Sequence, residues 1–271
     1  MRISRSRRLF CTLGAVTLLL AACGDDDSDA TSGDDSGAEP TPEERGTLTV
    51  CSDTPYEPFE FEGEDGEQTG FDIELLRAIA DGMNQDIEVT DQDFEGIWLA
   101  PQAGTCDIVA SAMTITPERA ELALFSDPYF DAEQSLMVLT ENEETFATLA
   151  DLGGETIGVQ SGTTGETYAN ENKPEGAEVK GFPDSSAMFL ALESGDVAAL
   201  LQDLPVNGYR ATQNDAFVVV ETYPTDEQYG FAADLDNTEL IDDVNEQLQA
   251  LRDDGTYDEI YAEWFGEAPS S

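Results

Sequence analysis

Short apolar runs alternate with longer amphipathic stretches from residue 47 to residue 265, which is the pattern of an α/β protein. In the first part of this region the pattern predicts strands at 47–52, 86–90 and 107–111 and helices at 71–83 and 94–103. Because strands and helices alternate, we expect a mostly parallel sheet that is covered by helices.

A second alternating series begins at residue 135. It predicts strands at 135–140, 155–159, 177–181, 197–201 and 217–220, separated by helices at 163–172, 184–193 and 205–212. Asp184 suits the N-cap of its helix, and Pro205 suits a first helical turn. A final strand at 229–233 and helices at 237–252 and 256–265 form a tail.

If the tail returns to the first series, the chain crosses between two lobes twice, near 129–134 and 223–228. We therefore expect one lobe from residues 47–132 plus 226–271 and a second from 133–225, each with a central mostly parallel sheet, joined by a two-strand hinge. Ligands bind at the carboxyl ends of such strands, so the cleft between the lobes is the expected site.

The N-terminus has the pattern of an export signal. Four arginines precede an apolar run at 9–22, and small residues follow it, which predicts a signal peptide over residues 1–22. The segment Leu20–Cys23 resembles the lipobox of bacterial lipoproteins, in which Cys23 would carry the lipid. An uncleaved anchor helix is the alternative, and the export route, Sec or twin-arginine, stays open. Residues 23–46 are acidic, lack large apolar side chains, and predict a disordered linker.

The chain is strongly acidic. Its 11 Lys and Arg face 59 Asp and Glu, for a net charge of −48. Repulsion excludes nucleic acid as a partner. The acid load favours salt adaptation, because molar salt screens self-repulsion; an ordinary acidic surface is the alternative.

Histidine is absent and cysteine is scarce. Without histidine, the commonest general base and metal ligand is missing, so we expect no catalytic residue, no metal and no cofactor. Of the four cysteines, Cys11 lies in the signal and Cys23 is the lipidation candidate. Cys51 and Cys106 are left, and they form either a disulfide or two small buried thiols.

Polar and aromatic residues follow the predicted strands at six places, where they could contact a small polar ligand. These candidates are Asp53, Tyr56, Phe94, Ser111, Ala112, Thr114, Arg119, Gln160, Thr163, Thr164, Gln202 and Asp203. Arg119 lies in a short helix just past the strand 107–111, and its planar guanidinium can bind a carboxylate bidentately.

Purely structural roles are the alternatives. Arg119 could pair with Glu118 or Glu121 at the surface. Asp203 could cap the helix that begins near Pro205. The two threonines could likewise be a plain helix cap, and the two aromatic candidates could belong to the core.

Two motifs carry a family resemblance. The segment Thr114–Arg119 (Thr-Ile-Thr-Pro-Glu-Arg) and the tail 251–266 resemble those of the amino-acid-binding extracytoplasmic solute receptors of ABC importers, such as the glutamine- and lysine/arginine/ornithine-binding proteins. The resemblance covers residues 47–265 and implies the type II periplasmic-binding-protein, or Venus flytrap, fold.

The resemblance also implies roles for the candidates. Arg119 would bind the α-carboxylate of an amino acid, with the backbone N–H groups of Thr163 and Thr164 as further donors at a helix N-terminus. Asp203 would bind the α-ammonium, helped by the Thr114 hydroxyl and the carbonyl of Ser111 or Ala112. Tyr56 and Phe94 would sandwich the side chain.

The identity of the ligand is less determined. Asp53 could accept from an amide or a cationic tip, and Gln160 and Gln202 suit amide or guanidinium groups. The negative field favours cationic or neutral polar amino acids. Glutamine-like and arginine- or lysine-like ligands are therefore both expected.

The predicted function is a monomeric, extracytoplasmic, lipid-anchored receptor that delivers a polar amino acid to an ABC permease with its ATPase. One alternative is a ligand sensor without transport, which needs a separate signalling partner. The other is an enzyme like cyclohexadienyl dehydratase, which needs a proton donor, and Asp53 is the candidate.

Overall fold

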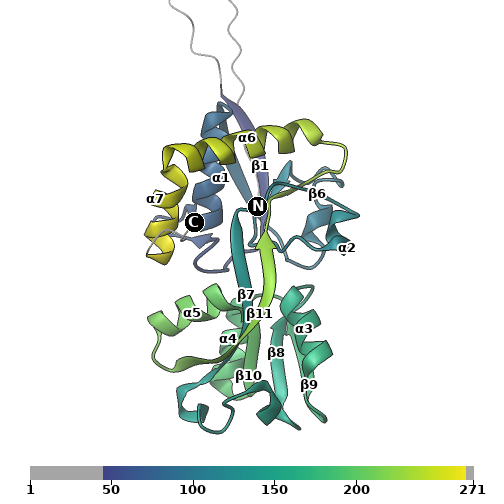
Figure 1. The fold of residues 1–271 in the computed structure, drawn as a ribbon, viewed down its shortest axis with the longest axis vertical. Coiled ribbons are helices and arrows are strands. Elements are labelled where there is room, and N and C mark those ends of the chain that lie inside the picture. The colour runs from purple at the N-terminus through teal and green to yellow at the C-terminus, as the bar shows by residue number, and fades with distance from the viewer. Residues whose placement is uncertain (1–44, 267–271) are drawn as a thin grey trace, which may run out of the picture. The chain divides into compact units, whose positions relative to one another are not determined.

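The computed structural model describes residues 45–266, which are built around two five-stranded sheets (Figure 1). The expected signal peptide, Cys23 and the linker up to residue 44 lie outside these residues. The first sheet has the order β4 (Gln85–Asp91), β1 (Gly46–Ser52), β5 (Ile108–Val109), β12 (Ala232–Ala233), β6 (Leu124–Phe125). The second has the order β11 (Phe217–Tyr229), β7 (Phe130–Leu139), β10 (Ala199–Asp203), β8 (Thr156–Gln160), β9 (Glu178–Phe182). A small hairpin pairs β2 (Phe61–Glu62) with β3 (Gln68–Thr69). We call the part built on the first sheet lobe 1 and the part built on the second lobe 2.

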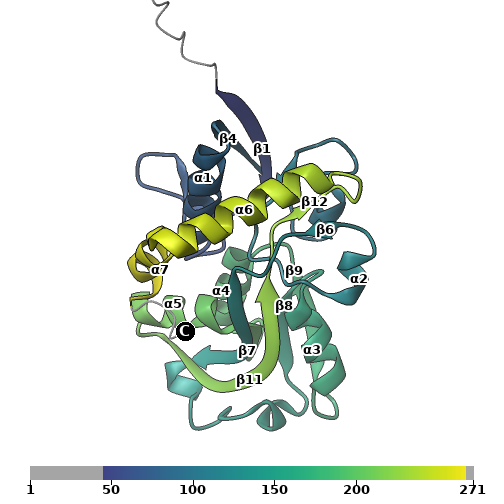
Figure 2. The same cartoon turned by 45° about the horizontal axis from the view of Figure 1, so that its top comes forward.

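Helices cover both sheets (Figures 1 and 2). They are α1 (Phe71–Gly82), α2 (Pro117–Ala120), α3 (Thr164–Asn172), α4 (Ser185–Ser194), α5 (Leu204–Gln213), α6 (Thr238–Asp254) and α7 (Thr256–Phe265). In lobe 1, α1 packs on β4, and α6 and α7 pack on α1. In lobe 2, α3 and α4 pack on β8 and β10, and α5 packs on β7 and β11. Among the described residues, no helix is both long and apolar enough to cross a bilayer.

Each sheet is mixed rather than wholly parallel. The strands that alternate with helices pair in parallel, β1 with β4 and β5, and β8 with β9 and β10. The strands that carry the chain between the lobes or back into lobe 1 pair antiparallel. Parallel neighbours need a crossover connection, whereas returning strands do not, so topology explains the mixture.

The hinge consists of two long strands. β7 and β11 pair antiparallel from Phe130 opposite Tyr229 to Leu139 opposite Phe217, with two register shifts on the way. Figure 1 shows both strands running between the two lobes. The predicted short strand at 217–220 is thus the beginning of a 13-residue strand, because the hinge continues its pairing.

Three predicted elements of lobe 1 are shorter than expected. The strand expected at 229–233 is only Ala232–Ala233, because Tyr229 ends the hinge strand β11. The predicted helix at 94–103 is only a 3-10 turn at Ile97–Leu99, because Gly96 adopts a left-handed φ of 82° and Pro101 follows closely. The predicted strand at 107–111 pairs only at Ile108–Val109. Its continuation turns at Ala112, whose φ is 41°.

An aromatic cluster joins the tail to the base of the hinge. Phe265, from the last helix, lies 5.4 Å from Phe59, 5.4 Å from Phe71 and 5.0 Å from Phe130, measured between ring centroids. Tyr229, at the end of β11, stacks on Phe130 at 5.6 Å. Such pairs each add about 1 kcal/mol beyond the area they bury. The tail therefore holds lobe 1 to the hinge.

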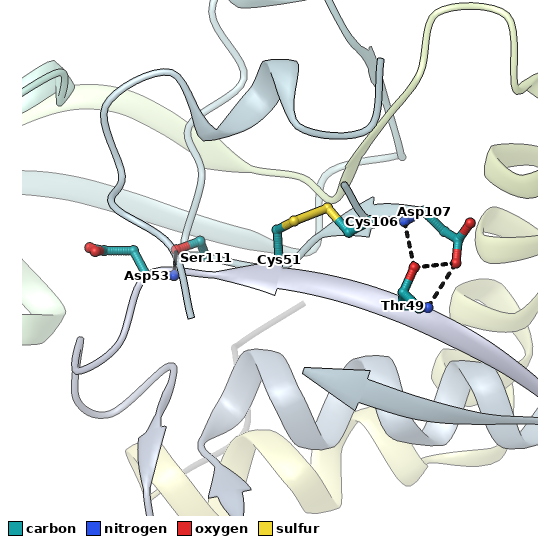
Figure 3. The surroundings of a disulfide bond; sticks show 6 residues. All are labelled: Thr49, Cys51, Asp53, Cys106, Asp107 and Ser111. Carbon is teal, nitrogen blue, oxygen red and sulfur yellow. Dashed lines mark hydrogen bonds between the residues drawn. A yellow bond between two sulfur atoms is a disulfide. The ribbon is translucent and has the colours of Figure 1, made fainter. Parts of the chain in front are cut away.

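Cys51 and Cys106 form a disulfide with a Cα–Cα distance of 5.8 Å (Figure 3). Regular parallel pairing would place Cys51 opposite Val109, three residues beyond Cys106. The approach is possible because Cys106 precedes β5 and its chain is drawn onto β1 by Asp107, whose amide donates to the carbonyl of Thr49 at 2.9 Å. The disulfide is therefore the outcome of the two possibilities left open by the sequence.

This bond spans 55 residues and should matter for stability. We expect reduction, or the double substitution C51A/C106A, to lower the free energy of unfolding by about 4 kcal/mol, since the unfolded chain regains loop entropy. Urea unfolding with and without reductant measures this. The double variant should not respond to reductant; a wild type that does not respond either would contradict a stabilising role.

Candidate ligand-binding site

Ten of the twelve candidate residues line one cavity between the lobes. From lobe 1 these are Asp53, Tyr56, Phe94, Ala112, Thr114 and Arg119, and from lobe 2 they are Gln160, Thr163, Thr164 and Asp203. Asp53 directly follows β1, whereas Gln160 and Asp203 are the last residues of β8 and β10. The cavity therefore lies where strand carboxyl ends of both sheets meet, as the sequence predicted.

Arg119 is held in the cavity by its short helix and by two aromatic rings. The Thr116 hydroxyl caps α2 by accepting from the Arg119 amide at 3.2 Å, and Pro117 fixes the first turn. The guanidinium carbon lies 5.2 Å from the ring centroid of Phe94 and 4.9 Å from that of Trp98. Both distances suit cation–π contact. Trp98 was not among the predicted site residues.

The guanidinium contacts both lobes and keeps donors free. Its two terminal nitrogens donate to the carbonyls of Thr114 at 2.8 Å and Gly162 at 3.0 Å. Because a guanidinium has five N–H donors, three are left for a ligand. The side chain is buried and, within residues 45–266, makes no ion pair, which argues against pairing with Glu118 or Glu121. Burial lowers the Arg119 pKa to about 10.

Asp203 accepts hydrogen bonds from three neutral groups. Its Oδ2 accepts from the hydroxyls of Tyr56 at 2.8 Å and Tyr229 at 2.6 Å, and its Oδ1 accepts from the amide of Gln134. Burial, and then repulsion from Glu227, raises the pKa of Asp203 to about 6, although these hydrogen bonds oppose the rise. Asp203 makes no side-chain bond to the N-terminus of α5, so helix capping does not explain it.

Asp53 and Gln160 form an acidic end of the cavity. The Gln160 amide donates to Asp53 Oδ2 at 2.5 Å and to the carbonyl of Pro183 at 3.0 Å. Burial raises the pKa of Asp53 to about 7, and the carboxylates of Asp91 and Asp184 add to the rise. This end therefore combines acceptors with negative charge.

Glu227 lies beside the cavity and joins both lobes, although the sequence did not suggest it. Its Oε2 accepts from the hydroxyls of Thr114 at 2.7 Å and Thr164 at 2.6 Å, and its Oε1 accepts from Gln134 at 3.0 Å. It belongs to the hinge strand β11, at a register shift that follows Tyr223. Glu227 does not follow a predicted strand, so the pattern of strand ends does not indicate it; its position in the predicted crossing 223–228 is the signal that the sequence offers.

Two candidates do not line the cavity. Ser111 lies behind it, where its hydroxyl accepts from the Asp53 amide and donates to Glu60, both at 3.0 Å. Gln202 donates its amide to Asn207 at 2.8 Å, because neighbouring residues of a strand point to opposite faces. Both are thus placed as supports for the strand ends.

Thr163 has the structural role that was the alternative, and it also lines the cavity. As N-cap of α3, its hydroxyl accepts from the Glu166 amide at 3.0 Å. The helix that it caps begins at Thr164, so the N-terminus of α3, which is the positive end of the helix dipole, faces the cavity.

No cluster of three or more potential metal ligands occurs in the described part of the chain.

A cavity lined by two α/β lobes, with a two-strand hinge beside it, defines a periplasmic binding protein of type II. The chain belongs to the bacterial extracellular solute-binding proteins, family 3, which it matches over residues 48–267.

Individual relatives bind amino acids. The chain is 33% identical to ABC transporter arginine-binding protein 1 of Escherichia coli (strain K12), over 78% of this chain and 87% of that protein. It is 33% identical to the ABC transporter glutamine-binding protein GlnH of Bacillus subtilis (strain 168), over 76% of each. An ancestral arginine-binding protein bound to arginine is similar in structure, with a TM-score of 0.76 and 39% identity, over 82% of this chain and all of that one.

The raised pKa of Asp53 makes stability depend on pH. Folded Asp53 holds its proton more tightly than unfolded Asp53, so its contribution is full below the ordinary pKa and is lost as pH rises to about 7. We expect D53N to flatten the fall of unfolding free energy across this range by up to about 1.4 kcal/mol per pH unit. Urea unfolding at several pH values measures the slope. The exposed-site variant D236N should match wild type; a D53N slope equal to that of wild type would refute the assignment.

Proposed function

We propose that this protein is an extracytoplasmic receptor that binds a basic amino acid, arginine first among them, and delivers it to an ABC importer. One observation carries the choice of ligand: the cavity residues include the carboxyl groups Asp53 and Asp203 but only one cation, Arg119, and Glu227 lies directly beside them. A ligand with one negative and two positive groups complements this set better than glutamine does.

The ligand's common part would lie between Arg119 and Asp203. The three free N–H donors of Arg119 suit the α-carboxylate, and the positive end of α3 adds to the attraction. Asp203 would bind the α-ammonium, and a cation there would replace the neutral donors as its main partner. Tyr56 and Phe94 supply flat walls for the aliphatic part of the side chain.

The ligand's side chain would reach Asp53 and Gln160. A guanidinium could donate to the Asp53 carboxylate and to the Gln160 amide oxygen together, and its charge would lower the pKa of Asp53. An uncharged amide would leave the Asp53 charge without a partner, which is costly for a buried carboxylate. This difference favours arginine or lysine over glutamine.

Transport and anchoring complete the proposal. We propose that lobe 1, residues 47–132 plus 226–271, and lobe 2, residues 133–225, close on the ligand, and that the closed form docks as a monomer on a permease with its ATPase. Lipid on Cys23 would tether the domain outside the membrane through the linker. The net charge of −48 suits work at high salt.

Binding rather than catalysis is proposed because the named relatives are binding proteins. The candidate proton donor for a dehydratase, Asp53, accepts a hydrogen bond from the Gln160 amide, which suits the acceptor role proposed for it here. A sensor without transport would use the same cavity, so ligand binding alone does not separate it from a transport receptor.

Removing the Arg119 guanidinium should strongly weaken ligand binding. We expect R119A to weaken arginine binding by about 2–5 kcal/mol, as when one partner of a buried charge pair is lost. Isothermal titration calorimetry measures this. R77A, which removes an exposed arginine from α1, serves as the matched control and should bind like wild type. Unchanged affinity in R119A would rule out the carboxylate role.

Ligand identity can be tested by thermal shift, because a bound ligand raises apparent stability by mass action. Among the twenty amino acids, arginine should give the largest shift, and glutamine a smaller one at equal concentration. D53N should reduce arginine affinity at least about tenfold while changing glutamine affinity much less. Equal losses for both ligands would show that Asp53 does not read the side chain.

A further inference from the structure

Two fully buried carboxyl groups, Glu60 and Asp72, lie behind the wall of the cavity. Neither side chain is exposed. Asp72 is the second residue of α1, and its amide donates to the carbonyl of Phe59 at 3.0 Å, which brings the backbones of the two acidic residues together. Neither residue belongs to the ligand-binding set.

Each carboxyl group bonds one of two successive residues at the turn after β5. The Ser111 hydroxyl donates to Glu60 Oε1 at 3.0 Å. The Ala112 amide donates to Asp72 Oδ2 at 2.8 Å, and the hydroxyl of Tyr129 donates to the same oxygen at 2.5 Å. Together the two acids hold the segment that brings Ala112 into the cavity wall.

One oxygen of each acid is left over. Glu60 Oε2 and Asp72 Oδ1 are both buried and have no hydrogen-bond partner. Within residues 45–266, neither acid pairs with a lysine or arginine. Two ionised carboxylates that are buried without a cation and close enough to repel each other would be very unfavourable, and so would two buried oxygens without a donor.

We propose that Glu60 and Asp72 share one proton, which Glu60 Oε2 carries and donates to Asp72 Oδ1. A single proton removes both difficulties, because it cancels one charge and supplies the missing donor. The pair then works as a positioning element: it fixes Ser111 and Ala112, and through the Ser111 hydroxyl it also holds the amide of Asp53, at 3.0 Å.

The surroundings place the proton on Glu60. Burial raises the pKa of Asp72 to about 7, but two hydrogen bonds, from Tyr129 and Ala112, favour its charged form and limit the rise. Glu60 receives one, from Ser111, and burial, then Asp72, and then Asp53 and Asp203 raise its pKa well above the ordinary value. Among residues 45–266, the other titratable group that hydrogen-bonds to the pair is Tyr129, a neutral donor.

A backbone conformation explains why this segment needs such support. Ala112 has a φ of 41°, in the left-handed region that side chains other than glycine rarely adopt. The bond from its amide to Asp72 helps to hold it there. Loss of the shared proton would leave two repelling charges behind this strained turn, so affinity for the ligand should fall as pH rises.

The variant E60Q isolates the proton. Glutamine keeps a carbonyl for Ser111 and an N–H donor for Asp72, but it cannot titrate. Folded Glu60 keeps a proton that unfolded Glu60 releases, so its stabilisation is full below the ordinary pKa and is lost as pH rises. We expect E60Q to lower the pH dependence of the unfolding equilibrium constant by one proton, up to about tenfold per pH unit.

Two further readouts test the pair directly. The infrared band of a protonated carboxyl at neutral pH should weaken in E60Q and stay unchanged in E62Q, a matched control two residues away on the exposed side of β2. D72A removes the carboxylate oxygen that accepts from the Ala112 amide and the Tyr129 hydroxyl. It should therefore weaken arginine binding about tenfold more than E60Q does.

The positioning role depends on the proposed function, whereas the shared proton does not. If wild type does not bind arginine, the proposed function fails, yet the infrared and unfolding measurements still report on the proton. If D72A does not fold, those two measurements on E60Q are sufficient. A protonated-carboxyl band and a pH slope that are both unchanged in E60Q would overturn the inference.

Discussion

The described structure depends on one carboxylate that three parts of the chain hold in common. Asp203 ends a strand of lobe 2 and accepts hydrogen bonds from Tyr56 of lobe 1 and from Tyr229 of the hinge. Each donor comes from a different part, so this geometry exists only when the lobes are together. If the ligand's cation binds Asp203 as proposed, it acts where the lobes meet, and ligand affinity and lobe closure would be linked through the same atoms.

Burial of acidic groups without cations is the second theme. Asp53, Asp203 and Glu60 all have raised pKa values because the protein withdraws them from water, and neutral donors rather than cations hold them. If lysines or arginines neutralised these carboxyl groups, the groups would attract a cationic ligand only weakly. At the cavity, the negative charges are only partly compensated. Behind the cavity, the proposed shared proton compensates the buried acids. Some buried acids are thus available to a cationic ligand, whereas the proposed proton neutralises others.

Much of the fold and the cavity could be predicted because strand ends follow from topology. Alternating strands and helices fix which residues reach the cleft, and Asp53, Arg119 and Asp203 lie there as expected. Trp98 was missed because the contacts of a 3-10 turn depend on long-range packing. Glu227 was missed because it lies within the hinge rather than at a strand end, although the predicted crossing at 223–228 contains it. The helix expected at 94–103 was wrong for a local reason, because Gly96 adopts a left-handed φ and Pro101 follows closely.

In the disulfide, Cys51 lies two residues before Asp53, and Cys106 lies five residues before Ser111 (Figure 3). The disulfide therefore covalently joins the two segments that lead into one wall of the cavity. In a reducing compartment hydrogen bonds and apolar packing would join these segments, whereas in an oxidising one a covalent bond adds to them. The redox state of the compartment in which the protein folds should therefore affect how well ordered this wall of lobe 1 is before a ligand binds.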